Sequence, residues 1–148
     1  MLVLNGDGFT SGLARFYDQH PRFTEPTAKV YVKVTVAGYA VPVLAQVDTG
    51  AAYSTLETQV AEGLGLLDLR GHPTRISTRL GAIGGQLVSL PLTLIADVGE
   101  SLDLEATFFI SRDWTGATFL GYTGLLDRLR LALDSPANLF HFGDGIVS

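Results

Sequence analysis

The chain has 148 residues, 47% of them apolar and only 17% charged, with a formal net charge of -5. This length suits one domain, and the apolar content excludes a disordered chain and a coiled coil. The acidic balance argues against a nucleic-acid partner, which needs a clustered basic face. Because the chain has no cysteine, disulfides, iron–sulfur clusters and thiol nucleophiles are excluded. The low charge content suggests that a second copy of the chain covers some apolar surface.

The sequence shows neither a membrane span nor a targeting signal. Its longest apolar-rich stretch, residues 87–96, contains Ser89, Pro91 and Thr93 and is too short to span a bilayer. Residues 1–15 lack a basic start followed by an apolar core, so we expect no signal peptide. We therefore expect a cytoplasmic protein without a membrane partner. The three histidines do not have metal-ligand spacing, which argues against a metal site.

The first 27 residues differ in pattern from the rest of the chain. Residues 1–27 contain Gly, Asp and Pro at short intervals, which predicts an N-terminal arm outside the core. Within this arm, residues 13–17 are expected to form a helical turn. The domain itself is expected over residues 28–148.

Hydrophobic periodicity in residues 28–148 predicts a mostly β domain with two short helices. Residues 29–36 alternate between apolar and polar side chains, which indicates a half-buried strand. A nearly unbroken apolar run over residues 40–47 predicts the next strand, and residues 58–66 have helical spacing. Further strands are predicted at 74–80, 86–96, 102–110 and 118–120, a second helix at 124–130, and a closing hairpin over 131–142.

The strongest motif is Asp48-Thr49-Gly50, directly after the apolar run. Burying an acid costs several kcal/mol unless hydrogen-bond donors surround it. Gly50 allows a tight turn, through which backbone amides and the Thr49 hydroxyl can reach the Asp48 carboxylate. The same residue types also suit an ordinary turn after a strand. The motif alone therefore leaves both a catalytic acid and a structural turn open.

Two further motifs follow along the chain. Residues 80–86 are rich in glycine and are predicted to form a hairpin tip at 81–85. Such a tip can close over a ligand and donate backbone amides, or it can be an ordinary turn. Residues 119–121, Phe-Leu-Gly, end a predicted strand just before the second helix.

The order of these motifs resembles the retropepsin family, the single-domain, retroviral-type aspartic proteases and their cellular and bacterial relatives. Residues 48–51 match the active-site loop of that family, and residues 81–85 lie where its flap tip is expected. Residues 119–121 match the apolar-apolar-Gly step before the family's C-terminal helix. The resemblance covers residues 28–143, and residues 54–66 look more like bacterial and retroelement members than like viral ones.

The resemblance implies a closed, barrel-like retropepsin (acid protease) fold with a flap hairpin and short helices. It also implies a homodimer that acts as an aspartic endopeptidase on a peptide or protein substrate. Asp48 from each protomer would share one proton with its copy and activate a water, without a metal or organic cofactor. The resemblance assigns catalytic roles to Asp48, Thr49 and Gly50, and substrate-binding roles to Ala51, Ala52, Tyr53, Ala82, Ile83 and Gly84. It also places the loop around Trp114 near the substrate cleft.

Two positions depart from the family pattern. Viral members usually carry an acid two residues after the motif's Gly, and an Arg after the later Gly that pairs with it. Here these positions are Ala52 and Tyr122. Both partners of the pair are missing together, so no buried charge is left unpaired. The departure keeps an alternative open, in which the chain is a catalytically inactive, dimeric binding or assembly module.

Overall fold

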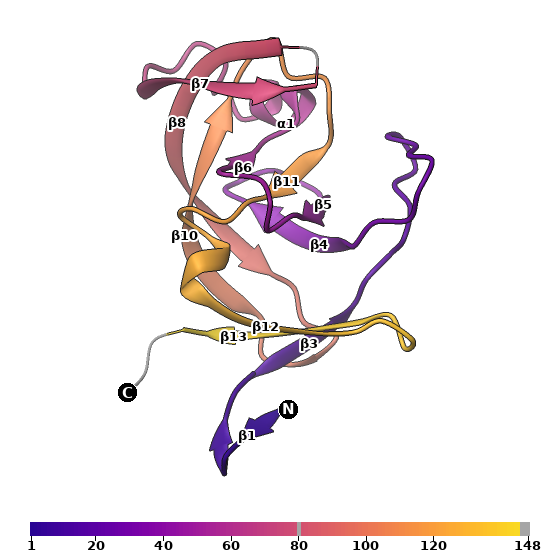
Figure 1. Cartoon of the computed structure of the whole chain (residues 1–148). Helices are drawn as coiled ribbons and strands as arrows, with labels where there is room; N and C mark the ends of the chain where they lie inside the picture. The colour runs from indigo at the N-terminus through magenta and orange to yellow at the C-terminus, as the bar shows by residue number, and fades with distance from the viewer. Residues whose placement is uncertain (80, 146–148) are drawn as a thin grey trace.

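A computed structural model describes residues 1–79 and 81–145 and shows a mostly β protein (Figure 1). Its helical elements are the short α-helix α1 (Thr58–Gly63) and the 3-10 helix η1 (Leu126–Arg128). Its strands are β1 (Val3–Leu4), β2 (Asp7–Gly8), β3 (Gly12–Arg15), β4 (Tyr31–Val36), β5 (Val43–Val47), β6 (Ser54–Thr55), β7 (His72–Thr78), β8 (Gly81–Leu94), β9 (Val98–Gly99), β10 (Leu102–Ile110), β11 (Thr118–Leu120), β12 (Leu129–Asp134) and β13 (Leu139–Asp144).

In the described part of the chain, six strands form a closed barrel in the order β10-β6-β11-β5-β4-β8, and pairing of β8 with β10 closes the ring. The apolar side chains of the alternating pattern fill the interior of this barrel. Val34 faces Leu94 across the β4–β8 pair, and both side chains are at most 1% exposed. The strands predicted at 29–36 and 102–110 are thus confirmed as β4 and β10. No helix in the described residues is long and apolar enough to cross a bilayer.

A second sheet lies below the barrel and corrects the expectation for the N-terminal residues (Figure 1). Its strand order is β12-β13-β3-β9. Residues 13–17 do not form a helical turn, because β3 pairs with β13 and with β9 instead. Ala14 and Phe16 are each 5% exposed and pack in the core with Phe140 and Phe142. This part of the expected arm therefore belongs to the core, whereas the β1–β2 hairpin is exposed.

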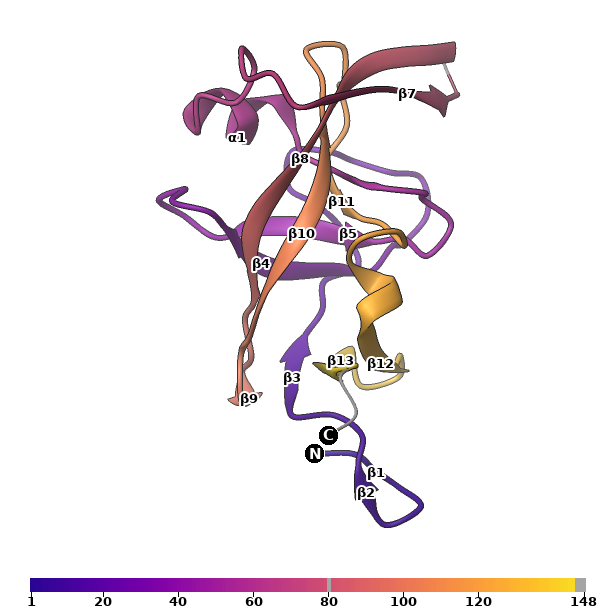
Figure 2. The ribbon, with the colours of Figure 1, turned by 90° about the vertical axis from the view of Figure 1, so that its left-hand side faces the viewer.

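The second predicted helix is also shorter than expected. Of residues 124–130, only Leu126–Arg128 are helical, as the single turn of η1. From Leu129 onward the chain pairs with β13, so strand pairing ends the helix that local spacing favours. The first predicted helix, at residues 58–66, is confirmed as α1 but ends at Gly63. Figure 2 shows α1 and the β7–β8 hairpin at the end of the barrel opposite the second sheet.

Candidate active site

The ends of two neighbouring strands hold the loop that contains Asp48. β5 and β11 run parallel, with Val47 opposite Leu120, and the amide of Asp48 donates a hydrogen bond to the carbonyl of Leu120 at 3.0 Å. The next residue, Gly121, has no room for a side chain, since a Cβ there would lie 2.3 Å from the carbonyl of Tyr53. The Phe-Leu-Gly step therefore has a clear local role. Leu120 accepts the amide of Asp48, and Gly121 lets the chain pass close to Tyr53.

Asp48 itself is partly buried, and its loop is only partly braced. The amide of Gly50 donates to Asp48 Oδ1 at 2.9 Å, as the motif predicts. The Thr49 hydroxyl makes no hydrogen bond to Asp48 among the described residues, and Thr49 and Gly50 are both exposed. Among the described residues, the Asp48 carboxylate thus accepts one hydrogen bond, from a backbone amide, and lies beside two exposed residues. A substrate or a second chain that packs on Thr49 and Gly50 can therefore reach Asp48.

The rest of the predicted loop lies beside the segment that follows β11. The amide of Tyr122 donates to the carbonyl of Ala51 at 2.8 Å, and that of Thr123 donates to Ala52 at 2.9 Å. Tyr53 also forms a bridge with Thr123. Ala52 is exposed, and Tyr122 is 53% exposed. The two positions that depart from the family pattern therefore lie on adjoining segments of one open surface.

The structure does not place the predicted flap residues as a hairpin tip. Ala82, Ile83 and Gly84 lie within β8 and pair with β7, from Gly81 opposite Thr78 onward. Strand pairing thus continues through the glycines at 81, 84 and 85. Residue 80, where the predicted loop begins, is outside the described residues. In the described chain, no hydrogen bond joins residues 82–84 to the Asp48 loop, so their role over a substrate stays a prediction.

Two adjacent glycines of β8 differ sharply in the room around them. A Cβ on Gly85 would lie 2.3 Å from the Ile110 carbonyl and 2.8 Å from the Phe109 ring, whereas a Cβ on Gly84 would meet nothing within 4 Å. We expect Gly85→Ala to lower the free energy of unfolding by about 1–3 kcal/mol, because the backbone must move away. Gly84→Ala, the matched control, should change it by less than about 0.5 kcal/mol. Urea denaturation checks both, and equal effects would contradict the close approach at Gly85.

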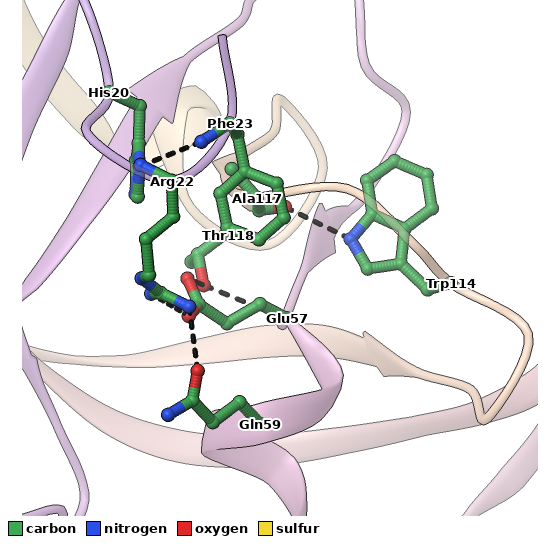
Figure 3. A network of polar contacts seen from close by, with 8 residues as sticks. All are labelled: His20, Arg22, Phe23, Glu57, Gln59, Trp114, Ala117 and Thr118. Carbon is green, nitrogen blue, oxygen red and sulfur yellow. Dashed lines mark hydrogen bonds and ion pairs between the residues drawn. The ribbon is translucent and has the colours of Figure 1, made fainter.

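A closed N-terminal loop, residues 18–29, lies against the barrel. Its base is fixed by two hydrogen bonds between the backbones of Tyr17 and Tyr31, at 2.8 and 2.9 Å. His20 is 3% exposed, and its Nδ1 accepts the backbone amides of Arg22 and Phe23 at 3.0 and 3.3 Å (Figure 3). Burial, helped by the Arg22 charge and opposed by Glu57, lowers the pKa of His20 below its usual 6.5. Near pH 7, His20 is therefore neutral in the folded chain, with Nδ1 free of a proton to accept the two amides.

This shift makes stability depend on pH in a defined direction. The unfolded chain binds a proton at His20 at higher pH than the folded chain does, so the free energy of unfolding should decrease as pH falls below about 6.5. The slope for one proton is at most about 1.4 kcal/mol per pH unit. His20→Asn is the matched control, since the Asn oxygen can accept the same two amides without titrating. Denaturation from pH 7.5 to 5 should show a smaller slope in this variant. Equal slopes would mean that His20 does not carry the effect.

Trp114, a weaker candidate, is held by its own loop. Its Nε1 donates to the Ala117 carbonyl at 3.0 Å, and its ring meets Phe119 edge-on at 5.4 Å.

A cavity of about 370 Å³ lies elsewhere, between β10 and β12, and does not include the Asp48 loop. No group of three or more His, Asp or Glu side chains within residues 1–79 and 81–145 could hold a metal ion.

Sequence reasoning missed the ion pair between Arg22 and Glu57. Glu57 is 1% exposed and pairs with Arg22, which lies 35 residues earlier, and it also bonds Thr118, which lies 61 residues later. No local pattern connects positions so far apart. The one available signal is Glu57 itself, a carboxylate directly before the helix predicted at residues 58–66.

The barrel and the Asp-Thr-Gly loop define the fold as that of a retropepsin-like aspartic protease. The sequence pattern of a family described as aspartyl protease matches residues 32–106, about half of the chain, and the chain belongs to this family. A retropepsin-like aspartic protease from Rickettsia conorii has a similar structure, with a TM-score of 0.52 and 18% identity over 92% of this chain and 95% of that one.

The retroviral protease-like domain of Ddi1 from Leishmania major is similar to the same degree. Its TM-score is 0.52 at 20% identity, covering 78% of this chain and 93% of that one. No curated protein matches the sequence. These structures confirm the fold that the motif order predicts.

Proposed function

We propose that the protein is an aspartic endopeptidase whose active site is completed by a second copy of the chain. The observation that carries this proposal is the position of Asp48, at the end of β5 in an Asp-Thr-Gly loop held against β11. The sequence holds this motif once, whereas the chemistry needs two carboxylates. The exposure of Thr49, Gly50 and Tyr122 around Asp48 supports a partner on this face.

The proposed mechanism uses the two Asp48 carboxylates as a pair. Like charges about 3 Å apart cannot both ionise, so the pair shares one proton. The ionised Asp48 takes a proton from a water molecule as the water oxygen attacks the scissile carbonyl. The protonated Asp48 gives its proton to the carbonyl oxygen, which yields a neutral tetrahedral intermediate. The Asp48 that took the water proton then gives it to the leaving nitrogen, while the other Asp48 takes a proton from a hydroxyl of the intermediate, so that the C–N bond breaks to give an amine and a carboxylic acid. Every proton moves between the water, the carboxyl pair and the peptide.

The neighbouring residues receive supporting roles in this proposal. Thr49 braces the two loops across the dimer axis, and Gly50 contacts the substrate backbone. Residues 51–53, with two small side chains and one aromatic ring, line apolar subsites. Residues 82–84 of β8 cover the bound peptide. The pairing of these residues with β7 supports this role, since it holds them on a β-hairpin.

The test is whether the purified chain cleaves unstructured peptides in a way that needs Asp48 and is blocked by a statine-type transition-state mimic. Cleavage with inhibition supports the endopeptidase. The replacement of an acid and an arginine by Ala52 and Tyr122 favours one rival, the inactive binding or assembly module. A chain that dimerises, binds peptides and never cleaves them would establish that rival.

A further inference from the structure

Glu57 is a buried carboxylate that contacts β11, the strand that also holds the Asp48 loop. Its side chain is 2% exposed, and burial of an ionised group without partners is strongly unfavourable. Thr118 Oγ1 donates to Glu57 Oε2 at 3.2 Å, and the amide of Glu57 donates back to Thr118 Oγ1 at 3.2 Å. The other carboxylate oxygen, Oε1, pairs with the guanidinium of Arg22 (Figure 3). Two partners distant in sequence therefore hold one buried acid.

Arg22 reaches this acid from the N-terminal loop. Its Nη2 donates to Glu57, and its Nη1 donates to Gln59 Oε1 at 2.6 Å, so one guanidinium joins the loop to the start of α1. The side chain of Arg22 is 50% exposed, in contrast to that of Glu57. The N-terminal loop, residues 18–29, lies before the part of the chain that matches the family pattern. Arg22 therefore lies outside the matched residues, whereas Glu57 lies within them.

The same contacts lead directly to Asp48. Thr118 is the first residue of β11, and the last residue of β11, Leu120, accepts the amide of Asp48. Glu57 therefore contacts one end of a three-residue strand whose other end holds the Asp48 loop. A shift of Glu57 moves Thr118, and β11 is too short to absorb the shift.

We propose that Arg22 and Glu57 are positioning residues, whose ion pair fixes β11 and thereby the Asp48 loop. The N-terminal loop is then a permanent part of the working protein and not a segment that is removed. The inference rests on the proposed function for its kinetic consequence alone. Its structural consequence, the placement of the Asp48 loop, is measured without any activity.

The unequal exposure of the two side chains gives the proposal a distinctive signature. Arg22→Gln leaves Glu57 buried without its counter-ion. Glu57→Gln instead leaves Arg22 half-exposed, where water can solvate it, and keeps an oxygen for Thr118. Arg22→Gln should therefore be the more damaging change, and adding Glu57→Gln should rescue it. An arginine that acts only through packing would give additive losses.

The experiment compares Arg22→Gln, Glu57→Gln and the double variant with the wild-type chain. The control is Asp68→Asn, which breaks the exposed Arg112–Asp68 ion pair, whose side chains are 61% and 90% exposed. We expect Arg22→Gln to lower the Tm by at least about 5 °C, the double variant to recover most of that loss, and the control to stay within about 2 °C. Should Arg22→Gln fail to fold, folding of the double variant gives the same answer.

The position of the Asp48 loop is measured separately from the stability of the chain. The NMR amide signals of Asp48 and Gly50 should shift in Arg22→Gln, return toward wild type in the double variant and stay unchanged in the control. On a peptide substrate, kcat should fall about tenfold with KM changed less than about twofold. Unmoved amide signals, or additive losses in the double variant, would overturn the proposal. A wild-type chain without peptidase activity would overturn the proposed function, while the amide signals and the Tm values still decide this inference.

Discussion

Asp48→Asn should reduce kcat/KM by at least about a thousandfold while the chain stays folded. The variant loses the group that moves protons in the formation and the collapse of the tetrahedral intermediate. Asn cannot ionise and so cannot accept the proton of the attacking water. Its side-chain oxygen can still accept the Gly50 amide, which is the contact that Asp48 Oδ1 makes in the structure. Stability should hold or rise, since the variant also removes like-charge repulsion between paired carboxyls. A fluorogenic peptide assay and a thermal melt measure the two quantities.

The matched control for this variant is Asp134→Asn. Asp134 also begins a turn after a strand, and its Oδ1 accepts the amide of Ala137 at 3.3 Å. Its turn continues Ser-Pro and lacks the glycine of the Asp48 motif. Activity of Asp134→Asn should stay within about twofold of wild type. An Asp48→Asn chain that retains activity within tenfold of wild type would rule out the aspartic mechanism.

Activity should require two copies of the chain, so specific activity should fall when the protein is diluted below its dimer dissociation constant. One chain supplies one Asp-Thr-Gly motif, and a two-fold axis through the site places Asp48 beside its own copy. The measurement is specific activity across a dilution series, set against the mass found by sedimentation. A monomer with full specific activity at low concentration would overturn both the dimer and the mechanism.

Mixing experiments test the shared site more directly. After exchange with a ninefold excess of Asp48→Asn chains, about one wild-type chain in ten keeps a wild-type partner. Activity per wild-type chain should therefore fall about tenfold. The same excess of Asp134→Asn chains should instead raise the total activity roughly in proportion to the chains added, because those chains are active and supply an intact partner carboxylate. Equal effects of the two additions would show that the site does not span the dimer.

The sequence pattern predicts an element correctly where the structure of that element depends on residues close to it in sequence. The alternation of residues 29–36 and 102–110 predicts β4 and β10, because a half-buried strand repeats every two residues. The Asp48 loop is equally local, since its amide donor lies two residues after the acid. Local reasoning failed at residues 13–17, where the partner strand β13 begins more than a hundred residues later.

The candidate site shows the same division. The turn expected at residues 81–85 is a strand, because glycine is compatible with a turn and also with a close approach of two strands, as at Gly85. The Arg22–Glu57 pair joins two segments that only the closed barrel brings together. Each residue has an unremarkable local context, and the energetic reason for the pair, burial of Glu57, exists only in the folded chain.

The continuity of β8 has a mechanical consequence. Residues 81–87 of this strand are paired with β7, and residues 92–94 are paired with β4, while residues 86–94 are also paired with β10. In the described part of the chain, residues 88–90 pair with β10 alone, while the carbonyl of Pro91 also accepts the amide of Ala37 at 2.8 Å. We therefore expect any displacement of the β7–β8 hairpin to bend one unbroken strand about residues 88–90, which are held at both ends. We expect the hairpin to bend elastically and not to rotate about a hinge, because β8 is one continuous strand. A force on the hairpin is then transmitted along β8 to the wall of the barrel.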